Sequence, residues 1–102
     1  MRAALEIDFF WVPASVGGHR SGPYLGMRLT IRWQRYIEAF LLRSRDVECV
    51  SLSFDPEQRR GNGTFVFLSN DALPSGWLQQ GELIELLSGY KVLAVGKIIQ
   101  SD

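Results

Sequence analysis

The segment from residue 81 to residue 99 constrains the fold of this chain more than any other. Two runs of apolar and β-branched residues flank the short sequence Ser88-Gly89-Tyr90. Gly89 has no Cβ, so it can adopt a backbone conformation that other residues resist in a tight turn. The pattern predicts an antiparallel hairpin of two strands at this end of the chain.

Two earlier segments alternate apolar and polar side chains, as half-buried strands do. Residues 5–11 form the first, and Pro13 ends it. Residues 27–33 form the second, which carries Arg28 and Arg32 on its outer face. We expect the following side chains to face the core: Leu5, Ile7, Phe9, Trp11, Met27, Leu29, Ile31 and Trp33.

A third alternating segment begins at Val47. The alternation predicts that Val50, Leu52 and Phe54 face the core, because side chains two residues apart share one face of a strand. Cys49 would then face away from the core.

Turns and loops separate these strands. An Asn-Gly pair tolerates positive φ in a tight turn, so we place a turn at residues 59–63 and a strand at residues 64–68. Residues 14–26 and 70–81 are rich in turn-forming residues and predict loops. Residues 36–46 fit one face of a helix or of a strand, and we expect a strand. Six or seven short strands without a helix predict a small all-β antiparallel barrel or sandwich.

Length and composition limit what else the chain can be. Its 102 residues suit one domain, 1–102, with an ordinary 46% of hydrophobic residues and a formal net charge of zero. No apolar run reaches the roughly 18 residues that a spanning helix needs, so we expect no membrane contact and a cytoplasmic location. Cys49 is the only cysteine, which excludes an intrachain disulfide and a cysteine-based zinc site. We expect neither a metal nor a cofactor.

Four glycine-led blocks carry a resemblance to a known family. They are Gly17-Gly18-His19-Arg20-Ser21-Gly22-Pro23, Gly26-Met27-Arg28-Leu29-Thr30-Ile31, Gly63-Thr64-Phe65-Val66-Phe67-Leu68, and the hairpin from Gln80 to Gly96. In order and character these blocks resemble the third domain of elongation factor Tu, a small antiparallel β-barrel. The resemblance implies a barrel of six to seven strands that serves as a non-catalytic binding module. It implies structural roles for Gly17, Gly18, Pro23, Gly26, Gly89 and Gly96.

One turn departs from the family pattern. The family's Arg-Glu-Gly-Gly-Arg turn, which approaches the T-stem of tRNA, is here Leu87-Ser88-Gly89-Tyr90-Lys91. Leu87 and Ser88 replace the arginine and the glutamate, so tRNA binding is left open. These 102 residues contain no counterpart of the family's GTPase domain, and the stretch from Gly89 to Lys97 has neither the glycine spacing nor the Ser or Thr of a phosphate loop. We therefore expect no nucleotide binding.

Arginines concentrate between residues 19 and 45, where six of them accompany a single acid, Glu38. Arginine and aromatic side chains on a β-surface grip phosphates and stack bases, so structured RNA is one candidate partner. The alternative is that the arginines cover strands with their stems and pair with the acids of residues 47–57. Candidate contact residues for RNA or another partner are Arg20, Arg28, Arg32, Trp33, Tyr36, Tyr90 and Lys91.

Two other functions compete with RNA binding. The C-terminal hairpin carries apolar side chains on both faces, including Leu87, Leu93 and Val95, which a protein partner or a second copy of the chain could cover. A sheet that buries both faces within one chain explains the same pattern. A small hydrolase or transferase would use the loop around His19, with Cys49 as a thiol nucleophile. No spacing brings His19 and Cys49 together, so we expect no catalysis.

Overall fold

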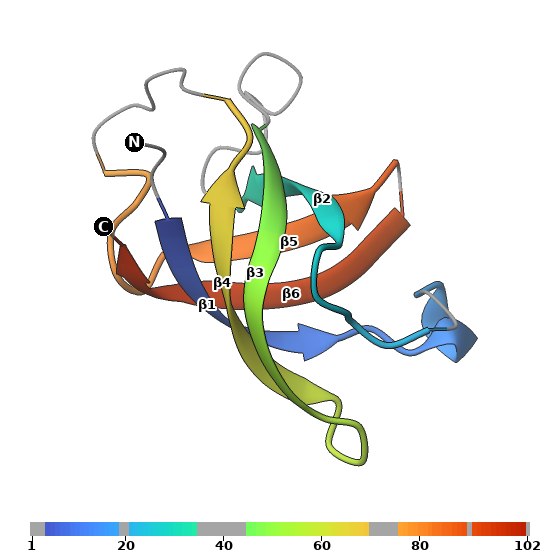
Figure 1. Ribbon diagram of the computed structural model, residues 1–102. Coiled ribbons are helices and arrows are strands. Elements are labelled where there is room, and N and C mark those ends of the chain that lie inside the picture. Colours follow the sequence, from blue (N-terminus) through green and yellow to red (C-terminus); the bar gives the residue numbers. More distant parts are fainter. Residues whose placement is uncertain (1–3, 19–20, 35–44, 70–75, 90, 102) are drawn as a thin grey trace.

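The computed structural model describes residues 4–18, 21–34, 45–69, 76–89 and 91–101. Within these ranges, six strands form a closed antiparallel barrel in the order β1-β4-β3-β2-β5-β6 (Figure 1). The elements are β1 (Ala4–Trp11), the 3-10 helix η1 (Ala14–Val16), β2 (Arg28–Trp33), β3 (Arg45–Asp55), β4 (Arg60–Phe67), β5 (Leu83–Ser88) and β6 (Lys91–Ser101). This architecture confirms the prediction of a small all-β antiparallel barrel.

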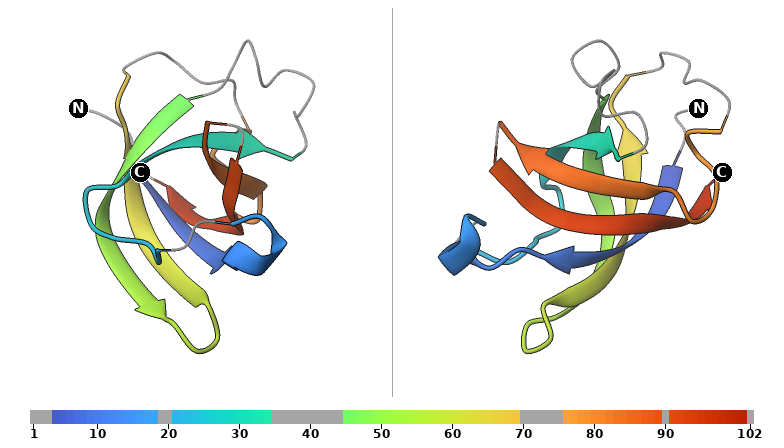
Figure 2. Two further views of the ribbon diagram at one scale, coloured as in Figure 1. Left: turned by 90° about the vertical axis from the view of Figure 1, so that its right-hand side faces the viewer. Right: turned by 180° about the vertical axis from the view of Figure 1, so that it is seen from behind.

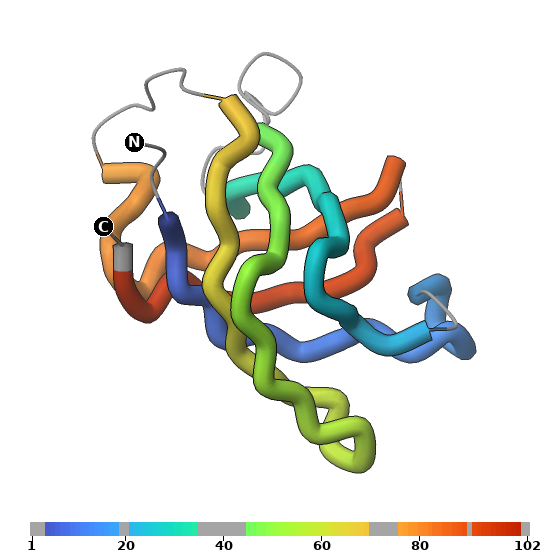
Figure 3. Tube along the Cα trace, in the orientation of Figure 1, coloured from blue at the N-terminus to red at the C-terminus, as the bar shows by residue number. Residues whose placement is uncertain are grey.

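The inner wall of the barrel follows the alternation of the sequence. Every core residue predicted for β1 and for the segment around β2 is buried. In a pleated strand, alternate side chains point to opposite faces, so one face of each strand fills the barrel interior. The first and last strands close the barrel by pairing with each other, and Leu5 of β1 lies opposite Ser101 of β6 (Figure 3).

Tryptophan side chains hold the loops at both ends of the barrel. β1 and β2 run in opposite directions, so their last residues, Trp11 and Trp33, lie at opposite ends. Trp11 donates from Nε1 to the carbonyl oxygen of Ser21 at 2.9 Å. Trp33 donates from Nε1 to the carbonyl oxygen of Trp77 at 2.6 Å, and the two rings lie 4.8 Å apart between centroids. A buried indole N–H needs such a partner, and here each bond fixes a loop against the barrel.

The side of β3 that faces the core changes partway along the strand. Val47 and Cys49 are buried, a bulge follows Cys49, and Val50 is 48% exposed. Beyond the bulge, Leu52 and Phe54 pack against the core. The prediction that Val50 faces the core and Cys49 faces away was therefore wrong, because the extra residue of a bulge reverses the alternation.

The turn between β3 and β4 lies earlier in the chain than predicted. β4 already begins at Arg60, so residues 56–59 form the turn, and the prediction of a turn at residues 59–63 was wrong. Arg59 supplies a positive φ of 57°. Gly63 lies inside β4, where an added Cβ would be 2.7 Å from a carbonyl oxygen of β3. The Asn-Gly pair thus marks a close approach of two strands. The resulting hairpin projects beyond the other strands (Figure 2).

The C-terminal hairpin forms as predicted. β5 ends at Ser88, β6 begins at Lys91, and Gly89 adopts a positive φ of 62°. A bulge between Leu86 and Leu87 accompanies the burial of both side chains. The chain itself therefore covers part of the apolar surface that the sequence leaves on two faces of this hairpin.

Two other apolar residues of the hairpin differ in their exposure to solvent. Leu93 is buried within the chain, whereas Val95 is 41% exposed on the outer face. Only Val95 of this pair is open to a partner. No helix in the ranges given above is long and apolar enough to cross a membrane.

Candidate binding groove

The outer face of the barrel carries a groove where β1, β6 and β5 lie side by side. Register places Phe10 of β1 opposite Val95 of β6, and Val95 opposite Glu85 of β5. The row continues to Arg60 of β4 on one side and to Arg32 of β2 on the other. Directly opposite residues are close neighbours on one face of a sheet. This row therefore has an apolar centre and charged ends.

A second row runs beside the first, offset from it by two residues on each strand. Asp8 of β1 lies opposite Lys97 of β6, and Lys97 lies opposite Leu83 of β5. Gln34 extends the row, because its backbone N–H donates to the carbonyl oxygen of Leu83 at 3.0 Å. Residues two apart point to the same side of a strand, so both rows face outward.

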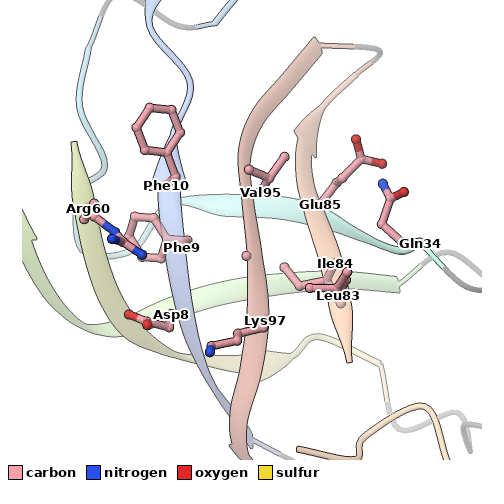
Figure 4. Close-up of a pocket in the computed structure, with 11 residues that line it drawn as sticks. Asp8, Phe9, Phe10, Gln34, Arg60, Leu83, Ile84, Glu85, Val95 and Lys97 are labelled. Atoms are coloured by element: carbon pink, nitrogen blue, oxygen red, sulfur yellow. The ribbon is translucent and has the colours of Figure 1, made fainter. Parts of the chain in front are cut away.

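Side chains of these rows border an open cavity of about 480 Å³ (Figure 4). Three apolar side chains on its border are exposed: Phe10 is 39%, Val95 41% and Leu83 58% accessible. Phe9 and Ile84, whose side chains belong to the core, also line it. A cavity of this volume falls in the size range of ligand pockets and has room for a large side chain.

Charge in the groove is uneven. The carboxylate of Glu85 is neutralised by Arg32, whose Nη2 lies 2.6 Å from Oε1. Arg60 and Lys97 are exposed, and neither forms an ion pair with another residue whose position is described. Figure 4 shows the charged end of Arg60 above Asp8 and that of Lys97 to the right of it. The two cations without an ion pair therefore lie on β4 and β6, on either side of β1.

Only part of the predicted contact set lies at the surface. Arg28 pairs with Glu48 at 3.1 Å, as in the alternative that pairs these arginines with the acids of residues 47–57, whereas the partner of Arg32 is Glu85, outside that range. Trp33 is buried, so it presents no surface to RNA. Lys91 is exposed at the start of β6. Four predicted residues lie outside the described ranges: His19, Arg20, Tyr36 and Tyr90. Residues 36–44 of the strand predicted at residues 36–46 also lie outside the described ranges.

The residues with family-implied structural roles occupy loops, a turn and one strand. Gly17 follows η1, and Gly18, Pro23 and Gly26 lie in the loop that leads to β2, while Gly89 forms the β5–β6 turn. Gly96 lies within β6, where an added Cβ would be 2.3 Å from the carbonyl oxygen of Asp8. Its missing side chain lets β6 approach β1 closely directly beneath the groove.

The thiol that the catalytic alternative would use as a nucleophile lies inside the barrel. The Cys49 thiol is buried and donates to the carbonyl oxygen of Ser51 at 3.3 Å. Burial raises the pKa of this thiol above its usual value of 9.0, which keeps it in the unreactive protonated form. Across the ranges that the structure describes, no group of three or more His, Cys, Asp or Glu side chains could hold a metal ion.

Sequence reasoning missed most of the groove. Phe10, Leu83, Arg60 and Lys97 were not among the predicted contact residues. One signal was present, because Phe10-Trp11-Val12 makes the end of β1 apolar on both faces. A half-buried strand has only one face for the core, so Phe10 had to point outward.

Comparison with known proteins assigns no family to this chain. The groove's own geometry is therefore what indicates a function. No protein-family profile matches the sequence, and no curated protein matches it.

Proposed function

We propose that this protein is a non-catalytic binding module that holds a protein partner in the groove on β1, β6 and β5. The observation that carries the proposal is the apolar centre of the groove, where Phe10, Val95 and Leu83 are exposed on three adjacent strands. An apolar patch rimmed by polar and charged groups is typical of a protein interface. A partner side chain in the cavity gains about 25 cal/mol for each Å² of apolar surface removed from water.

The closed barrel determines how a partner can dock on this side. β1, β6 and β5 each pair with a neighbour on both sides. Such strands have no free row of backbone N–H and C=O groups, so a partner cannot add a strand here. Contacts would come from side chains on the outer face.

The ion pairs on β2 favour a protein partner over structured RNA. Arg28 and Arg32 each contact a carboxylate, and binding a phosphate would cost those contacts. The formal net charge of zero also gives no general attraction for a polyanion. The relationship to the third domain of elongation factor Tu and a cytoplasmic location remain predictions, carried by the glycine-led blocks and by the apolar pattern of the sequence.

A random peptide library displayed on phage tests the proposal. Peptides selected on the wild-type protein are measured again on Val95→Glu, which places a charge in the groove, and on Val50→Glu. Val50 is a matched control, because it is similarly exposed on β3, outside the groove. We expect Val95→Glu to weaken binding at least about tenfold, or ~1.4 kcal/mol, and Val50→Glu to leave it unchanged. Selected peptides that bind both variants equally would disprove the proposal.

A further inference from the structure

We infer that the partner segment is acidic, with a carboxylate that pairs with Arg60 and Lys97 while an apolar side chain fills the cavity beside Phe10 and Val95. This inference rests on the proposed function and adds the chemistry of the partner to it.

The charges that face the groove leave an excess of cations. Its charged residues are Arg60, Lys97, Asp8 and Glu85, and Glu85 pairs with Arg32 of β2. Arg32 and Glu85 neutralise each other. Two cations then remain against one carboxylate, that of Asp8.

Both cations flank β1. Arg60 lies opposite Phe10 on the β4 side, and Lys97 lies opposite Asp8 on the β6 side. Asp8 forms no ion pair with either of them within the described part of the barrel. A second carboxylate entering over β1 would therefore meet two cations, neither of which forms an ion pair with Asp8.

The neighbouring apolar side chains strengthen this preference. Phe10 and Val95 exclude water once a partner covers them, and a charge pair beside such a contact is less screened than one in open solvent. A guanidinium also offers two parallel N–H donors to a carboxylate. A basic partner would bring its charge against Arg60 and Lys97, and this repulsion selects against it.

Two displayed peptide libraries of one design test the inference. Each fixes a central aromatic residue, and the flanking positions are drawn from Asp, Glu, Ser and Gly in one library and from Lys, Arg, Ser and Gly in the other. Peptides are selected on the wild-type protein and measured on Arg60→Gln, Lys97→Gln, Lys91→Gln and Val95→Glu. Lys91, a contact residue expected from the sequence, is the matched control, because the structure places this exposed lysine outside the groove.

We expect binders from the acidic library only. Their affinity should fall about three- to tenfold in Arg60→Gln and in Lys97→Gln, fall with added salt, and stay unchanged in Lys91→Gln. If both libraries give equal binders that lose affinity in Val95→Glu, the proposed function stands and the acidic partner is wrong. If binders from neither library respond to Val95→Glu, the proposed function fails as well.

Discussion

Arg32 and Glu85 lie opposite each other on β2 and β5, with 2.6 Å between Nη2 and Oε1. Their side chains are 22% and 12% exposed, whereas those of Arg28 and Glu48 are 70% and 30% exposed. Two ion pairs on the same strand thus differ in their access to water. Loss of one partner is costly where the remaining charge is poorly solvated, and costs little where water replaces it.

Neutralising the acid of each ion pair in turn should lower the free energy of unfolding by different amounts. We expect Glu85→Gln to lower the free energy of unfolding by about 1–2 kcal/mol, and Glu48→Gln to change it by less than about 0.5 kcal/mol. Glutamine keeps the shape of glutamate, so the comparison isolates the charge. Equilibrium unfolding in urea measures both values. Equal losses would show that burial does not set the strength of these pairs.

Arg59 should tolerate glycine better than alanine. Its φ of 57° lies in the left-handed region, and its side chain donates to the carbonyl oxygens of Trp11 at 3.0 Å and of Val12 at 3.3 Å. Both substitutions remove these bonds, but only glycine relieves the strained backbone. We expect Arg59→Ala to destabilise the protein by about 1–2 kcal/mol and Arg59→Gly by about 1 kcal/mol less. Thermal unfolding of the two variants checks the order, and the reverse order contradicts it.

Gly96 should not tolerate a methyl group. An added Cβ would meet the carbonyl oxygen of Asp8 at 2.3 Å, so β1 and β6 would have to separate. We expect Gly96→Ala to cost about 2–3 kcal/mol of unfolding free energy. Gly22→Ala is the control, because its Cβ would only touch the Phe54 ring at 3.4 Å. A control that loses as much stability as Gly96→Ala would show that the close approach is not the cause.

Local patterns in the sequence predicted the parts of the fold that depend on local geometry. The inward face of β1 follows from alternation alone, because a strand repeats every two residues. The turn at Gly89 follows from a glycine between two β-branched runs. Neither inference needs the identity of the neighbouring strand.

Features that depend on strand pairing could not be predicted in this way. The bulge after Cys49 is defined by its register with β4, and nothing in the local pattern marks it. Arg32 and Glu85 are 53 positions apart in the chain, and only the pairing of β2 with β5 makes them neighbours. The groove has the same origin, since Phe10 and Val95 meet across two strands that are distant in sequence. This surface therefore depends on which strands pair and in what register, and the local sequence pattern does not show either directly.

Cys49 should make the protein less stable at alkaline pH. Burial raises the pKa of its thiol above the usual 9.0, so the unfolded chain loses this proton at a lower pH than the folded one. The contribution is fully present below pH 9.0 and is lost as the pH rises toward the folded pKa, by at most about 1.4 kcal/mol per pH unit. Urea unfolding of the wild type and of Cys49→Ala, at about pH 7 and about pH 10, isolates the contribution of the thiol. The contributions of the other titrating groups cancel in the difference between the two proteins. We expect the stability advantage of the wild type to shrink at the higher pH. An advantage that stays constant would mean that the thiol titrates alike in both states.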